Sequence, residues 1–105
     1  MAEKFELMVA PNGARKGKGD HPALPITSAE LAETARDCAR AGATAIHVHV
    51  RDDDGRHSLD AARYRDAIAA IRAVSDIRIQ ITTEAVGMFD VAAQIACLAE
   101  VRAPE

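Results

Sequence analysis

The chain has 105 residues, of which 49% are hydrophobic and 28% charged, a composition typical of one globular domain. Its 13 Lys and Arg face 16 Asp and Glu, and only three aromatic residues (3%) are present, which argues against a nucleic-acid partner. No apolar run is long enough to span a membrane, and the first residues lack the apolar core of a signal peptide. We therefore expect a cytoplasmic protein with no membrane partner.

The first predicted unit is a strand followed by a helix. Residues 5–10 form a short apolar run before Pro11, which predicts a strand that ends in a loop. Thr27 and Glu30 have the spacing of a capping box and predict the start of a helix, which Gly42 ends. The apolar residues of this helix lie on one stripe at helical spacing: Leu31, Ala35, Cys38 and Ala39.

A second strand and helix follow at once. Residues 43–50 alternate in character, so that one face would carry Ile46, Val48 and Val50, and the other Ala45, His47 and His49. Ser58 or Asp60 is the expected N-cap of the next helix. The predicted buried stripe of this helix consists of Tyr64, Ile68, Ile71 and Val74.

The third unit repeats the pattern. Residues 77–82 alternate between isoleucine and polar residues, which predicts a strand with Arg78, Gln80 and Thr82 on one face. The apolar stripe Val91, Ile95 and Leu98 predicts a third helix. Cys38 and Cys97 are too few and too far apart for a disulfide framework, and we interpret both as inert core thiols on helices.

Three alternating units predict an α/β fold with a parallel sheet, either doubly wound or closed as a barrel. The polar face with His47, His49 and Gln80 favours the barrel, because doubly wound sheets are apolar on both faces. A (β/α)8 TIM barrel needs roughly 250 residues. Residues 1–105 are therefore expected to be the N-terminal part of a single TIM-barrel domain, about three βα units, which pairs with the rest of the barrel.

His47 and His49 form the most informative motif. Two histidines at i and i+2 on a strand point the same way, and neutral imidazoles suit Zn²⁺. The alternative is a pair of hydrogen-bonded histidines at the barrel mouth. A catalytic zinc needs a third protein ligand, either Glu84 or a residue outside this chain. His57 lies in a predicted loop, where a capping or surface role is the default.

The loop after the first strand is rich in cations. Arg15, Lys16 and Lys18 are interpreted either as a solvated mobile loop or as a cationic lid over an anionic substrate.

Several motifs along the whole chain resemble the β-keto acid cleavage enzymes. They are Pro11-Asn12-Gly13-Ala14-Arg15, Asp20-His21-Pro22, Ala41-Gly42-Ala43, His47-Val48-His49-Val50-Arg51-Asp52, Asp54-Gly55-Arg56-His57-Ser58 and Gln80-Ile81-Thr82-Thr83-Glu84. The resemblance corresponds to the first third of the barrel of that family.

The resemblance implies a zinc-dependent enzyme that condenses a β-keto acid with acetyl-CoA to give acetoacetate and a new acyl-CoA. His47 and His49 match the two histidine ligands of the family. The third ligand, a glutamate, and the acid/base residues are expected beyond residue 105, so no catalytic residue is assigned in this chain. Thr82 matches a hydroxyl residue that the family uses on the substrate carboxylate, with Thr83 beside it. Members of the family are commonly oligomers, so a homo-oligomer is expected.

Two residues depart from the relatives that act on amino-bearing keto acids. Those relatives carry a glutamate where this chain has Arg15, and a cation there would repel an ammonium and attract an anion. Glu84 stands where they have glycine, in the loop expected to bind the carboxylate. With Asn12, these residues complete the predicted substrate site: Asn12, Arg15, Thr82, Thr83 and Glu84.

Two other functions stay open. A TIM-barrel metal-dependent hydrolase also uses two histidines at a strand end, although on the first strand of the barrel. Alternatively, the chain is a catalytically inactive fragment of a barrel, and its exposed outer strands pair with other chains.

Overall fold

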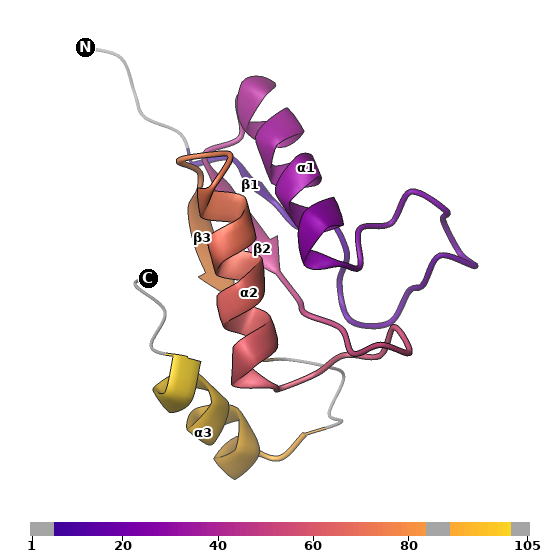
Figure 1. Ribbon diagram of the computed structural model, residues 1–105, viewed down its shortest axis with the longest axis vertical. Coiled ribbons are helices and arrows are strands. Elements are labelled where there is room, and N and C mark those ends of the chain that lie inside the picture. The colour runs from indigo at the N-terminus through magenta and orange to yellow at the C-terminus, as the bar shows by residue number, and fades with distance from the viewer. Residues whose placement is uncertain (1–5, 84–88, 102–105) are drawn as a thin grey trace.

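The computed structural model describes residues 6–83 and 89–101, and within them strands and helices alternate (Figure 1). The elements are β1 (Met8–Val9), α1 (Ser28–Arg40), β2 (Ala45–Val48), α2 (Ala61–Arg72), β3 (Arg78–Ile81) and α3 (Val91–Val101). The predicted order of three βα units is confirmed. No helix in the described ranges has the length and apolarity needed to cross a bilayer.

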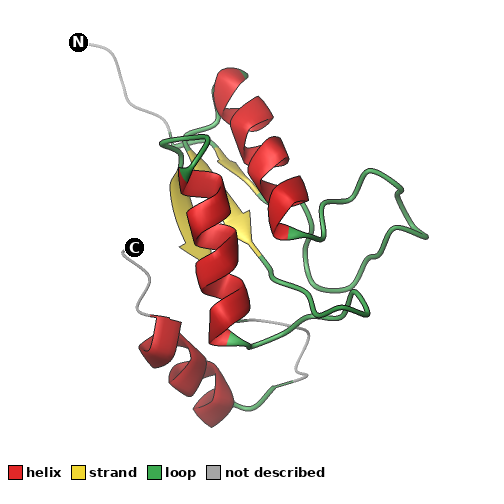
Figure 2. Ribbon diagram, in the orientation of Figure 1, coloured by secondary structure: helices red, strands yellow, loops and turns green. Residues whose placement is uncertain are grey.

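The three strands form one parallel sheet in the order β1-β2-β3. Figure 2 shows α1 and α2 side by side across the same face of this sheet, and the two helices pack against each other. Doubly wound sheets carry helices on both faces, with a reversal in the strand order. The three described strands and their two crossover helices therefore show an α/β fold, in an arrangement shared by a barrel and by one half of a doubly wound sheet.

The core lies between the sheet and the helices. Ile46 and Val48 of β2 and Ile79 of β3 point into it and are at most 3% exposed. From the helices, Leu31, Tyr64 and Ile71 complete the same cluster. On the opposite face of the strands, His47 is half-buried and Gln80 is exposed. The alternation predicted from the sequence is thus confirmed, with the polar side chains outside the core.

Both predicted helix starts are present. The Thr27 side chain accepts a hydrogen bond from the backbone N–H of Glu30, and Glu30 accepts one from that of Thr27, which completes the capping box. Of the two caps proposed for α2, Asp60 is the N-cap and accepts from the N–H of Ala62. Gly42 follows the end of α1 with a φ of 113°, a conformation that favours glycine.

Glu30 also binds the loop that precedes α1, through an ion pair of 2.7 Å with Lys18. The Lys18 side chain, followed by the N–H groups of Thr27 and Ile26, lowers the pKa of Glu30 from 4.5 to about 2. A carboxylate with a lowered pKa stabilises the fold above its unfolded pKa, and this contribution is lost as the pH falls.

Glu30→Gln should therefore lower the free energy of unfolding at pH 7 by at most about 1 kcal/mol, since the Glu30 carboxylate is partly exposed. The difference between variant and wild type should vanish as the pH falls from 4.5 to about 2. Urea unfolding across this range measures it, with the exposed Glu33→Gln as the control on the same helix. An equal difference at pH 7 and pH 2 would contradict the role of the charge.

Three details of the predicted elements are wrong. The strands are shorter than expected, and Phe5, in the first of them, lies outside the described residues. Val74 follows the end of α2 and is 44% exposed. On α3 the predicted stripe faces outward, and the buried residues are instead Cys97 and Val101. The outward apolar residues are Val91, Ile95 and Leu98.

The two cysteines differ as well. Both are free thiols, but Cys38 is only half-buried, whereas Cys97 is buried as expected. Burial is the main cause that raises the pKa of the Cys97 thiol. Cys97 is therefore an unreactive core residue at neutral pH.

Candidate metal and substrate site

His47 and His49 lie at the carboxyl end of β2, on the face of the sheet opposite to the core. His47 is the third residue of the strand, and His49 follows its last residue. Their rings approach edge to face, with centroids 5.4 Å apart. The two imidazoles are therefore neighbours, as the i, i+2 spacing predicts.

The ring of His47 is oriented by the adjacent strand. His47 pairs with Gln80 in the parallel register of β2 and β3, and its Nδ1 lies 2.6 Å from Gln80 Oε1. An amide oxygen can only accept a hydrogen bond, so this contact is a hydrogen bond in the tautomer that carries the proton on Nδ1. The lone pair of His47 is then on Nε2, the state in which an imidazole binds a metal ion.

A third histidine, His57, extends this pair. Its ring is 4% exposed and lies edge to face with His49, with centroids 5.0 Å apart. On its other side it approaches Phe89 at 5.9 Å. The surface role expected for His57 is wrong, because an antiparallel bridge between Arg51 and His57 folds the loop inward. Local sequence patterns carry no sign of this contact.

In the two described ranges, no group of three or more His, Cys, Asp or Glu side chains is arranged to hold a metal ion. The pair His47 and His49 thus supplies at most part of a metal site. Glu84, the candidate third ligand and substrate residue, lies outside the described residues.

Asn12 fixes the position of His49. Its amide nitrogen donates to the carbonyls of His49 at 2.8 Å and Pro25 at 3.1 Å, and its oxygen accepts from the N–H of His49 at 3.4 Å. Asn12 is only 5% exposed. Both amide hydrogens are used within the protein, so the side chain holds the end of β1 against the end of β2.

A hollow of about 530 Å³ opens beside these residues. It is lined by the loop after β1, residues 10–16, together with Leu24 and His49. Asn12, Arg15 and His49, three of the predicted site residues, are thereby brought to one place. Arg15 is exposed at its edge.

Arg51 holds the wall of this hollow in place. Its guanidinium donates to the carbonyls of Lys16 and Gly55 at 2.9 and 2.8 Å, and to those of Asn12 and Gly13 at 3.2 and 2.7 Å. The residue is 5% exposed, and burial lowers the pKa of its guanidinium. One side chain therefore ties together the loops that follow β1 and β2. This structural role was not predicted from the sequence.

Lys18 fastens the far side of the same loop. Besides its ion pair with Glu30, its ammonium donates to the carbonyls of Pro22 and Leu24 at 3.2 and 3.0 Å. Arg15, Lys16 and Lys18 are all exposed, as expected for a solvated loop, and these contacts tie Lys18 to the segment that precedes α1. Lys18 has a structural role, whereas Arg15 and Lys16 line the hollow.

The two predicted threonines lie at the end of β3 but have different surroundings. Thr83 is buried, and its hydroxyl donates to Gln94 Oε1 on α3 at 2.8 Å. Thr82 is half-buried, and its carbonyl accepts from the Tyr64 hydroxyl at 2.8 Å. Burial raises the pKa of Tyr64, which stays a neutral donor. Of the two hydroxyls, that of Thr82 is on the same face as Gln80 by alternation along the chain.

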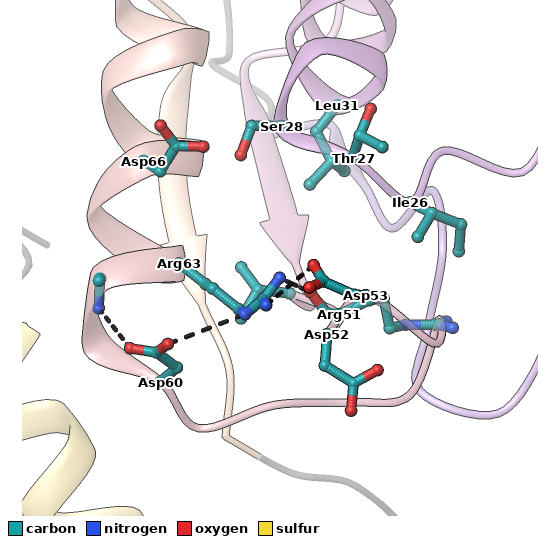
Figure 3. A pocket seen from close by; sticks show the side chains of 12 residues that line it. Ile26, Thr27, Ser28, Leu31, Arg51, Asp52, Asp53, Asp60, Arg63 and Asp66 are labelled. Carbon is teal, nitrogen blue, oxygen red and sulfur yellow. Dashed lines mark hydrogen bonds and ion pairs between the residues drawn. The ribbon is translucent and has the colours of Figure 1, made fainter.

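A larger hollow, of about 650 Å³, lies between the first turns of α1 and α2 (Figure 3). Figure 3 shows Arg63 between two aspartates, and its distances are 3.0 Å to Asp53 and 3.8 Å to Asp60. None of the predicted site residues within the described ranges lines this hollow. The predicted chemistry is therefore on the sheet and in the smaller hollow.

Comparison with known proteins identifies the family to which the chain belongs. The sequence model of the beta-keto acid cleavage enzyme family matches residues 4–105. A 3-keto-5-aminohexanoate cleavage enzyme from Fusobacterium nucleatum is 45% identical over 92 residues, which are 86% of this chain and 34% of that protein. A 3-oxoadipate:acetyl-CoA acetyltransferase from Cupriavidus necator is 38% identical over 72 residues, 69% of this chain and 25% of that protein.

A third relative, a 3,5-dioxohexanoate:acetyl-CoA acetone transferase from Paraburkholderia graminis, is 36% identical over 86 residues, or 79% of this chain and 28% of that protein. The chain thus spans about a third or less of the length of these curated relatives. The resemblance drawn from the motifs is confirmed by the match along nearly the whole chain. The chain belongs to the beta-keto acid cleavage enzyme family.

Proposed function

We propose that this chain is the metal-binding and substrate-binding first third of a zinc-dependent enzyme that cleaves β-keto acids with acetyl-CoA. The observation that carries the proposal is the pair His47 and His49 at one strand end in a member of this family. The complete protein would be a cytoplasmic (β/α)8 barrel, of which this chain supplies three βα units. The outer edges of β1 and β3 would pair with its other strands, and the barrels would form a homo-oligomer.

The two histidines fit a zinc ion. The hydrogen bond from Nδ1 to Gln80 leaves Nε2 of His47 with its lone pair, and His49 is held nearby by Asn12. The third ligand would be Glu84 or a residue of the remaining strands. A bound divalent ion polarises a keto oxygen and stabilises the negative charge of an enolate.

The substrate would occupy the hollow between Arg15 and His49. Arg15 would bind a negatively charged or polar tail of the keto acid, while the Thr82 hydroxyl would donate to its carboxylate. Thr83 and Asn12 would support these contacts indirectly, because their side chains are bonded to Gln94 and to backbone carbonyls. The name of the Cupriavidus necator relative specifies a keto acid with a second carboxylate, which suits a cation at this position.

The reaction breaks the bond between the keto carbon and the methylene carbon of the β-keto acid. The methylene carbon bonds to the acetyl group and gives acetoacetate, while the acyl group bonds to the sulfur of CoA. All atoms of the β-keto acid and acetyl-CoA are present in acetoacetate and the new acyl-CoA, so the reaction requires no further reactant. This chain supplies binding and orientation, and the proton transfers would fall to residues of later strands.

A chimera tests this function. The chain would replace the segment that it matches in the Cupriavidus necator relative, and mass spectrometry would follow acetoacetate and the new acyl-CoA from 3-oxoadipate and acetyl-CoA. We expect both products, and neither with His47→Ala in the same chimera. A folded, zinc-loaded chimera that forms no acyl-CoA from any β-keto acid would refute the proposal.

Arg15 should select the tail of the substrate. Arg15→Glu in the chimera replaces a cation by an anion, which should disfavour the anionic tail of 3-oxoadipate and favour the ammonium of 3-keto-5-aminohexanoate. The ratio of kcat/KM for 3-oxoadipate to kcat/KM for 3-keto-5-aminohexanoate should therefore fall by about tenfold or more, which corresponds to about 1.4 kcal/mol. Arg40→Glu makes the same charge change at the far end of α1 and serves as the control. A complete enzyme that favours the amino-bearing substrate with Arg15 in place would contradict this role.

A further inference from the structure

We infer that Gln80 is a positioning residue that holds His47 in the tautomer required for metal binding. The inference rests on the proposed zinc site. It assigns to β3 a function in that site which the residue pattern alone does not indicate.

The evidence is one short hydrogen bond and the register that creates it. His47 Nδ1 and Gln80 Oε1 are 2.6 Å apart, slightly shorter than the usual range of about 2.7–3.2 Å for N–H···O bonds. The two residues are direct partners in the parallel ladder between β2 and β3, so their side chains leave the sheet on the same face. The contact therefore follows from the backbone pairing.

The direction of the bond decides the chemistry. The amide oxygen faces the ring and accepts from Nδ1–H, so Nε2 keeps its lone pair. If the amide nitrogen faced the ring instead, it would donate to Nδ1, and the proton would be on Nε2, which could not then bind a metal ion. Metal-binding histidines commonly donate their other N–H to a carboxylate or a carbonyl oxygen. Gln80 supplies the equivalent acceptor with no charge.

The tautomer can be measured without any metal. In the metal-free 105-residue chain, at a pH where imidazole is neutral, two-bond ¹⁵N–¹H couplings would show which nitrogen of His47 carries the proton. We expect Nδ1–H in the wild type and a change to mainly Nε2–H in Gln80→Leu. Gln94 contacts Thr83 rather than a histidine, so Gln94→Leu is the matched control. Nε2–H in the wild type, or no change in Gln80→Leu, would overturn the inference.

Zinc affinity gives the second readout, by competition with a chromophoric chelator. Gln80→Leu should weaken zinc binding by about 10- to 100-fold, Gln80→Glu should retain it because a carboxylate also accepts from Nδ1–H, and Gln94→Leu should leave it unchanged. Equal zinc affinity in wild type and Gln80→Leu would overturn the role of Gln80 while the zinc site stands. A folded wild type that binds no zinc would mean that residues of later strands are needed to complete the metal site, and the tautomer would then decide by itself whether Gln80 positions His47.

Discussion

Zinc binding is expected to be lost when either His47 or His49 is replaced by alanine. Loss of a hydrogen-bond partner of a metal ligand typically lowers metal affinity by about 10- to 100-fold. Loss of a ligand itself should lower zinc affinity by more than about 100-fold. Elemental analysis of the purified chain, and competition with a chelator, measure the zinc content and affinity. About one zinc per chain is expected in the wild type.

The matched control is His21→Ala. His21 is an exposed loop histidine whose Nδ1 accepts from the N–H of Ala23, so its loss should leave zinc binding unchanged. Tight zinc binding that survives in both His47→Ala and His49→Ala would contradict the predicted site. A folded wild type without zinc would mean that residues of later strands are needed to complete it.

Arg51→Met is expected to lower the free energy of unfolding by about 3 kcal/mol or more. The substitution removes four hydrogen bonds that a charged donor makes to backbone carbonyls. Because Arg51 is only 5% exposed, those carbonyls would lose their partner in a region that water reaches poorly. Small domains have total stabilities of about 5–15 kcal/mol, so this is a large share. The loops that carry Asn12 and Gly55 should separate.

Urea unfolding measures this loss, with limited proteolysis of residues 12–19 as a local readout. Arg51→Lys keeps the charge but loses the planar fork, and should fall between wild type and Arg51→Met. Arg72→Met changes an exposed arginine at the end of α2 and is the control. An Arg51→Met variant as stable as Arg72→Met, with an equally protected loop, would show that the carbonyl contacts contribute nothing.

Local signals predicted most of the fold. The capping box of Thr27 and Glu30, the glycine at position 42 and the alternation around His47 each depend on neighbours within a few residues, and each is confirmed. The same alternation predicted that His47 and His49 would lie together. Such patterns can be read from the chain because helix and strand periodicity act over short distances.

Long-range contacts explain what could not be predicted from the sequence. Arg51 is followed by three aspartates, which suggests an exposed turn, yet its partners are carbonyls up to 39 residues away. His57 is buried through a bridge with Arg51, and Gln80 reaches its histidine across the sheet. The stripe Val91, Ile95 and Leu98 predicted the helix correctly but not its buried face. Periodicity shows which residues share a helix face, but it does not show which face packs against the rest of the chain.

The pairing of β2 with β3 restricts how the loop between α2 and β3 can change in length. Suppose that one residue is inserted or deleted within 73–77 and that β3 shifts by one position along β2. Because side chains alternate along a strand, Ile79 or Ile81 would then lie opposite His47 in place of Gln80. The same shift would turn Gln80 toward Leu31 and Tyr64 in the core. Changes of two residues would preserve the face, but place Arg78 or Thr82 beside the histidine. Relatives that share this site should therefore tolerate few insertions or deletions in this loop, whatever its sequence.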